Sequence, residues 1–240
     1  MEWELKAKVT HAQIANLLRE HLPLNPRHSE FIIKNDTYYS FGGIAPREPE
    51  KIVRTREERK YELKDVISVS SPFVDYLNEK DPVVWNSIAT QVVNLLRGYS
   101  MDFLSPSIKQ PETQVVLTVK EKKTIGDYEK NEEFEGELPA DTTTAFMKFV
   151  DMTNFKPYFR KDKNSVSFYT EEDGKLLHCE LVSVNGSDVY LEVEYCSDEM
   201  NFDVIPIIKH FMRDKVGVEK FDRRSWVNII EEMPLEAETE

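Results

Sequence analysis

Polar and apolar residues alternate strictly at the start of the chain. In residues 2–9, charged side chains occupy every second position and apolar side chains occupy the positions between them. A period of two is typical of a β-strand with one buried face. Alternation or aromatic runs predict further strands at residues 31–41, 51–64 (one long strand or a hairpin), 114–123, 132–138, 157–169, 175–184 and 189–196.

Helical patterns lie between and after these strands. Thr10 precedes apolar residues at helical spacing up to Leu22, and Asp81 with Pro82 forms a favourable N-cap and first-turn pair for a helix that reaches Arg97. Further helices are predicted after Asp141 and at residues 202–216 and 223–233. The strands and helices together predict an α+β protein.

Residues 65–113 differ from the strand-rich remainder. Serine and proline residues occur together near both ends of this segment, and a helix is predicted inside it. About 50 residues bury too little apolar surface to fold alone. We therefore expect a single domain over residues 1–240 with a helical insertion at about 65–113, which is a candidate for covering an opening of the domain or for forming a homodimer.

The composition narrows the class of protein. Against 31 Lys and Arg stand 44 Asp and Glu, a net charge of −13, which argues against a duplex nucleic-acid binder. With 40% hydrophobic residues the chain can form a core, but no apolar run is long enough to cross a membrane. The N-terminus lacks the pattern of a secretory signal, and the two cysteines have no metal-binding spacing. We expect a cytoplasmic protein without disulfides.

The charged faces of the predicted strands are sorted by sign. Acidic pairs or triplets occupy residues 2–4, 133–137 and 192–194, whereas basic pairs occupy residues 54–56, 120–122 and 161–163. Each face alone is compatible with contact to solvent. Like charges two positions apart repel, however, and a solvated surface needs no sorting by sign. The pattern favours a closed antiparallel barrel of about eight strands with a charged interior and helices packed outside.

A barrel interior with this mixture of charges suits one kind of ligand. Carboxylates bind the hard cations Mg²⁺ and Mn²⁺, which keep water ligands and bridge to phosphate oxygens. Arginine offers paired hydrogen bonds to phosphate, and lysine offers a compact positive charge. The residues therefore predict a site for a polyphosphate together with a divalent metal.

Several segments resemble the CYTH superfamily, also called triphosphate tunnel metalloenzymes. Glu2-x-Glu4-x-Lys6 is similar to the ExExK signature of that family. The other similar segments follow in the family's order: residues 35–39, 53–56, 117–120, 132–137, 161–163, 191–194 and 224–230. Lys163 stands where the family usually has arginine, and Glu180 stands near a usual aspartate. The resemblance spans nearly all of the chain outside residues 65–113.

The resemblance implies an eight-stranded tunnel that hydrolyses a small anionic triphosphate with Mg²⁺ or Mn²⁺. It implies catalytic roles for Glu4, Glu192, Glu194 and Lys6. The implied metal ligands are Glu2, Glu4, Glu133, Glu135, Glu192 and Glu194. The implied triphosphate-binding residues are Lys6, Lys8, Arg54, Arg56, Lys120, Lys161 and Lys163. We expect packing or rim roles for Asp36 and Tyr39, a core or surface role for His178, and core packing for Trp226.

Other functions stay open at this stage. The same cage suits a class IV-type adenylate cyclase, in which the ribose 3′-hydroxyl attacks the α-phosphorus of ATP, or an RNA 5′-triphosphatase. A non-catalytic module that binds polyphosphate or a nucleotide would share the basic strands without requiring paired carboxylates. The simplest alternative is an antiparallel β protein whose charged strands face solvent.

Overall fold

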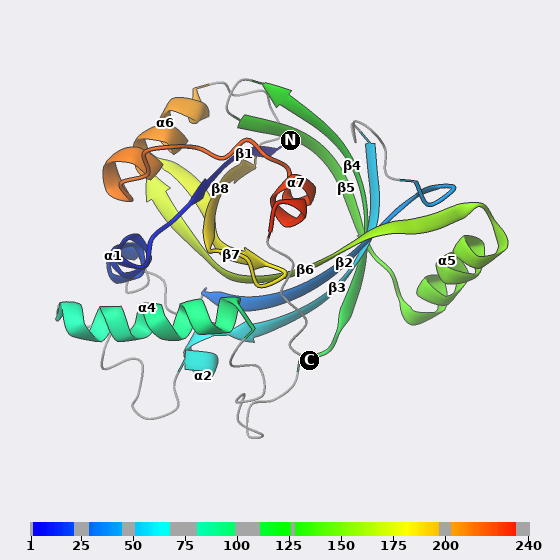
Figure 1. Ribbon diagram of the computed structural model, residues 1–240, viewed down its shortest axis with the longest axis horizontal. Coiled ribbons are helices and arrows are strands. Elements are labelled where there is room, and N and C mark those ends of the chain that lie inside the picture. The colour runs from blue at the N-terminus through cyan, green and yellow to red at the C-terminus, as the bar shows by residue number, and fades with distance from the viewer. Residues whose placement is uncertain are drawn as a thin grey trace.

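The barrel is closed by eight antiparallel strands. The structure, a computed structural model, describes residues 2–21, 29–44, 51–67, 81–98, 111–125, 128–196 and 203–233. The strands neighbour one another in the order β1-β5-β4-β3-β2-β6-β7-β8, and β8 pairs with β1 (Figure 1). Their bounds are β1 Glu2–Lys8, β2 Glu30–Phe41, β3 Lys51–Glu62, β4 Gln114–Ile125, β5 Tyr128–Glu137, β6 Phe155–Glu172, β7 Lys175–Val184 and β8 Tyr190–Cys196. The predicted fold class is confirmed, and β3 is a single strand.

The helices lie close to their predicted positions, except that α2 (Leu63–Ile67) was not predicted. The others are α1 His11–His21, α4 Pro82–Leu96, α5 Ala140–Met152, α6 Val204–His210 with the π-helical turn η4 Phe211–Lys215, and α7 Trp226–Glu231. The side chain of Asp81 caps α4 by accepting a hydrogen bond from the amide of Val83 at 2.9 Å. Helix α5 starts one residue before Asp141, so the prediction that Asp141 caps it is wrong. No helix among the described residues has the length and apolar character needed to span a membrane.

The main hydrophobic core lies outside the barrel, between its wall and the helices α1, α2, α4 and α6 with the turn η4. Trp3, Phe168, Leu177 and Val193 point outward from four strands and are fully buried. Figure 1 shows α1, α4 and α6 on this side of the barrel. The core therefore uses the apolar face of each strand and leaves the charged face for the interior.

The opposite wall is not covered in the same way. Val119 and Phe134 are direct neighbours on β4 and β5, point outward, and are 46% and 77% exposed. Helix α5 packs on a smaller cluster around Tyr39 and Phe155. The prediction that helices cover the barrel outside is thus confirmed for one wall and, within the described residues, wrong for this part of the other, because α1, α4 and α6 all pack into the same core.

Candidate functional site

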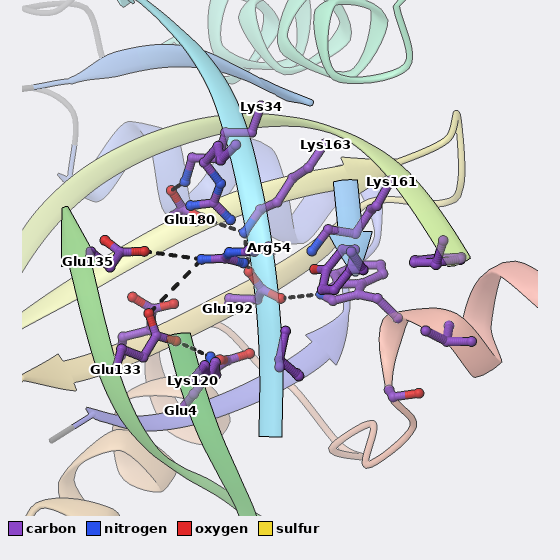
Figure 2. A pocket seen from close by; sticks show the side chains of 18 of the residues that line it. Glu4, Lys34, Arg54, Lys120, Glu133, Glu135, Lys161, Lys163, Glu180 and Glu192 are labelled. Carbon is purple, nitrogen blue, oxygen red and sulfur yellow. Dashed lines mark hydrogen bonds and ion pairs between the residues drawn. The ribbon is translucent and has the colours of Figure 1, made fainter. Parts of the chain in front are cut away.

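The charged faces of the strands enclose a cavity inside the barrel. It has a volume of about 260 Å³ and is lined by side chains from the strands and from the start of α7. Its lining includes these residues expected from the sequence: Glu4, Arg54, Arg56, Lys120, Glu133, Glu135, Lys161, Lys163, Glu192 and Glu194. Figure 2 shows many of them pointing toward one another from different strands. Strands far apart in the sequence thus bring the sorted charges into one space.

The first buried ion cluster is centred on Asp36, and we call it the Asp36 cluster. The carboxylate of Asp36 accepts two hydrogen bonds from Arg56, from Nε at 2.7 Å and from an Nη nitrogen at 3.2 Å. Lys161 Nζ lies 3.2 Å and an Arg54 Nη nitrogen 3.5 Å from the same carboxylate. Strand register explains the geometry, because Asp36 lies directly opposite Arg56 on β3 and Lys161 on β6. One buried carboxylate therefore positions three cations.

The electrostatics of Asp36 follow from these contacts. Asp36 is 1% exposed, and burial by itself would raise its pKa. The positive charges of Lys161, Arg56 and Arg54 outweigh burial and hold the pKa of Asp36 well below its usual value. Asp36 is therefore ionised, and its role is to orient the cations from inside the wall.

The second buried cluster contains Lys34, Lys163, Glu180 and Glu192, and we call it the Glu180 cluster. The two oxygens of Glu180 pair with Lys34 Nζ at 2.7 Å and with Lys163 Nζ at 2.6 Å. Lys163 also lies 2.6 Å from Glu192, whose other oxygen accepts a hydrogen bond from Trp226 Nε1 at 2.7 Å. Both oxygens of Glu192 are thus held by the protein.

The pKa values of the two lysines of this cluster shift in opposite directions. Burial lowers the pKa of Lys34, and the ion pair with Glu180 does not offset this shift because the positive charges of Lys163 and Arg56 also lower the pKa. Burial also acts on Lys163, but the carboxylates of Glu180 and Glu192 outweigh it and hold its pKa well above the usual value. The pKa of Glu192 falls to about 2, since Lys163 and Lys6 outweigh the cost of burying the charge. Lys163 is therefore the firmly charged centre of the Glu180 cluster.

Two glutamates of β5 pair with basic side chains that line the cavity. Glu133 forms an ion pair with Lys120 and lies 4.0 Å from an Arg54 Nη nitrogen. Glu135 accepts a hydrogen bond from Arg54 at 3.2 Å and another from the Thr118 hydroxyl at 2.9 Å. Arg54 therefore connects the Asp36 cluster to the carboxylates of β5. Dashed lines in Figure 2 mark its contacts with Glu133 and Glu135.

Glu4 and Glu194 form the acidic corner of the cavity. They lie directly opposite each other on the paired strands β1 and β8. Like charges at opposite positions of a ladder repel, and a cation between them would remove the repulsion. No group of three or more His, Cys, Asp or Glu in the described part of the chain is arranged to hold a metal alone. Mg²⁺ usually uses one or two carboxylates with water and substrate phosphates, so this donor set fits such an ion.

Two residues expected in the site, Lys8 and Lys6, have other surroundings. Lys8 is at the end of β1, where its side chain is 60% exposed and pairs with Asp188. Lys6 is buried, but its ammonium group donates to the carbonyl of Arg224 at 2.7 Å and lies 4.7 Å from the Trp226 ring. The side chain of Glu2 lies outside the described residues.

The cavity also contains residues that the sequence interpretation did not assign to it. These are Lys34, Tyr38, Tyr158, Phe159, His178, Glu180 and Trp226. Strand alternation carried the signal for Lys34 and Tyr38, which share a face with Asp36, and for His178, which shares a face with Glu180. The expectation of a core or surface role for His178 is wrong, because it lines the cavity. Trp226 packs as expected against a small core cluster of Val182, Tyr190 and Ile229, and it also lines the cavity.

Comparisons with known proteins agree with this architecture. No model of a protein family and no curated protein matches the chain. Among solved structures, the protein PH1819 from Pyrococcus horikoshii OT3 is 20% identical, with 97% of this chain and 99% of that chain covered and a TM-score of 0.62. HpAC1 from Hippeastrum, described as a candidate adenylyl cyclase with a dominant triphosphatase activity, is 12% identical over 96% of this chain and 95% of that chain, with a TM-score of 0.52.

A candidate adenylate cyclase from Vibrio parahaemolyticus gives a similar match. It is 13% identical, with 96% of this chain and 97% of that chain covered and a TM-score of 0.53. At such identities the matches show a shared fold. The matched chains are covered almost completely, so the similarity extends over the whole barrel and its helices. The predicted fold, a closed eight-stranded antiparallel barrel, is therefore confirmed.

Proposed function

We propose that this protein is a divalent-metal-dependent triphosphatase that releases the terminal phosphate of a small triphosphate. The proposal depends chiefly on the Asp36 cluster, in which three cations surround one carboxylate beside the cavity. The excess of positive charge and the paired donors of arginine suit phosphate oxygens. The triphosphatase activity attributed to HpAC1, which has this fold, supports the same chemistry.

Glu4 and Glu194 are the residues that we assign to the metal. Mg²⁺ or Mn²⁺ bound there would offset phosphate charge and help to orient the attacking water. Glu192 is assigned to holding Lys163 and Trp226, because both of its oxygens already accept hydrogen bonds. Arg54, Arg56 and Lys161 bind and orient the phosphate chain, and this positioning is the main contribution of protein side chains to phosphoryl transfer.

A phosphate-release assay tests the proposal. The substrates are tripolyphosphate, thiamine triphosphate and nucleoside triphosphates, each with Mg²⁺ and with Mn²⁺. We expect release that requires the metal and that falls by at least about 100-fold in Glu194→Gln. Glu171→Gln is the matched control, because Glu171 is an exposed glutamate near the end of β6. Binding of these compounds without phosphate release would instead indicate a non-catalytic module.

Cyclisation of ATP is the second candidate function. Two proteins with this fold, from Hippeastrum and Vibrio parahaemolyticus, are described as candidate adenylate cyclases. The reactions differ in which phosphorus is attacked, so their products separate them. Cyclic AMP and diphosphate from ATP would identify the cyclase, and inorganic phosphate would identify the triphosphatase.

A further inference from the structure

The imidazole ring of His178 is held between Ser167 and Glu194 inside the barrel. The three residues lie on the neighbouring strands β6, β7 and β8. His178 Nδ1 is 3.0 Å from Glu194 Oε2, and His178 Nε2 is 2.7 Å from the Ser167 hydroxyl. The ring also packs on Tyr169, with centroids 4.9 Å apart. Contacts at both nitrogens and at the ring face fix the orientation of the imidazole.

The chemistry of the partners determines which atom donates. An ionised carboxylate only accepts hydrogen bonds, so Nδ1 carries the proton and donates to Glu194. In the neutral ring Nε2 then accepts, and the hydroxyl of Ser167 donates to it. Ser167 is 4% exposed and therefore has a fixed environment. The hydrogen bonds thus run in one direction, from the wall of the barrel toward Glu194.

The hydrogen bond from His178 leaves one oxygen of Glu194 for the cavity. Oε2 is bound by His178, and in the described part of the chain Oε1 forms no hydrogen bond or ion pair. Glu194 lies directly opposite Glu4 and lines the cavity together with it. A glutamate side chain has several rotamers, and repulsion from Glu4 would favour those that separate the two carboxylates. His178 lies directly opposite Glu194 on the other neighbouring strand, β7, so its hydrogen bond selects one of these rotamers and fixes the carboxylate there.

We propose that His178, oriented by Ser167, is a positioning residue that holds Glu194 in place as a metal ligand. The inference rests on the proposed function, because it assumes that Glu194 binds Mg²⁺ or Mn²⁺. Hydrogen-bonded partners of ligating side chains typically contribute about 10- to 100-fold to metal affinity. His178 acts through Glu194 and does not itself contact the metal.

Binding of Mn²⁺ alone to the full chain, measured by calorimetry without substrate, tests this role. We expect His178→Ala to weaken Mn²⁺ binding by about 10- to 100-fold and Ser167→Ala by a smaller factor. His178→Asn should recover most of the affinity, because the asparagine amide nitrogen lies about as far along the side chain as Nδ1 and can donate to Glu194. His21→Ala is the matched control, since His21 is a partly buried histidine that bonds to Thr170 on another part of the wall.

The outcomes separate this inference from the proposed function. If Glu194→Gln weakens Mn²⁺ binding and His178→Ala does not, the positioning role is wrong and the metal assignment stands. If Glu194→Gln instead binds Mn²⁺ as tightly as the unaltered protein does, the assignment of Glu194 to the metal is wrong. If His178→Ala does not fold by circular dichroism, Ser167→Ala decides, and unchanged Mn²⁺ affinity there overturns the inference. If His178→Asn binds Mn²⁺ no more tightly than His178→Ala does, the inference is also overturned.

Discussion

The two buried ion clusters of the barrel contain the same kinds of residue in different proportions. The Asp36 cluster has three positive groups and one negative group, a net charge of 3 − 1 = +2. The Glu180 cluster has two lysines and two glutamates, a net charge of 2 − 2 = 0 when all are ionised. Both lie on the cavity, so position alone does not distinguish them.

The difference in net charge assigns phosphate binding to the Asp36 cluster and structural support of the barrel to the Glu180 cluster. Buried charges are costly unless they are paired, so an excess of positive charge is most stable when an anion completes it. Glu135 offsets part of the excess in the Asp36 cluster through its ion pair with Arg54, and the positive charge that remains suits a phosphate. The Glu180 cluster is already neutral, and through Glu192 it is hydrogen-bonded to Trp226 at the start of α7. We infer that it chiefly holds the wall and α7 in place.

Replacement of Arg56 should have the largest effect. Arg56→Ala removes a cation with two hydrogen bonds to Asp36 from the edge of the cavity. We expect kcat/KM for the best triphosphate to fall by about 1000-fold, the lower end of what an arginine contributes to phosphoryl transfer. Steady-state phosphate release measures it, with circular dichroism as the control for folding. A loss below about tenfold would mean that the phosphates bind elsewhere.

Neutralising the central carboxylate of each cluster should have the second-largest effect and should distinguish the two clusters. Asp36→Asn and Glu180→Gln each leave buried cations without a partner, and each should destabilise the fold by about 3–5 kcal/mol. Tripolyphosphate should restore the unfolding temperature of Asp36→Asn more than that of Glu180→Gln, because it would supply negative charge beside the Asp36 cluster. Thermal unfolding with and without tripolyphosphate measures both effects. Equal restoration in the two variants would contradict the division between binding and support.

Strand alternation predicted which face each charged residue would take. A strand places every second side chain on the same face, so Glu4, Arg54, Arg56 and Glu194 could be assigned to the interior without knowledge of their partners. The pairing of charges could not be predicted, because it depends on strand order and register. Asp36 meets Lys161 across more than a hundred residues of sequence, since β2 lies between β3 and β6.

Alternation also does not reveal how far the interior extends along a strand. Lys6 and Lys8 share the face of Glu4, yet Lys8 lies at the end of β1 against Asp188, and Lys6 binds the carbonyl of Arg224 just before α7. The position of α7 thus determines the environment of Lys6, whereas the end of the strand and Asp188 determine that of Lys8. The contact of Trp226 with the cavity was missed because it depends on the position of α7. His178 shares the alternating face of Glu180, but its hydrogen bond to Glu194 depends on strand register.

Acid should weaken both clusters, by less than the substitutions above. The folded-state pKa values of Asp36 and Glu180 lie well below the usual 3.8 and 4.5. A depressed folded pKa adds stability that is complete above the usual pKa and is lost as pH falls toward the folded value. The free energy of unfolding in urea should therefore decrease below about pH 4.5. Asp36→Asn and Glu180→Gln should each show a shallower decrease, and an unchanged slope in both would contradict the assigned ion pairs.

Replacement of Lys8 should have the smallest effect and marks the boundary of the site. Its ion pair with Asp188 is exposed, and such pairs contribute about 0–1 kcal/mol. Lys8→Ala should change the free energy of unfolding by less than about 1 kcal/mol and kcat/KM by less than about twofold. Lys161→Ala is the matched comparison, because it removes a lysine from the Asp36 cluster. If the two variants lose activity equally, the excess positive charge of the Asp36 cluster is not what binds the triphosphate, and general attraction by lysines near the barrel would explain binding better.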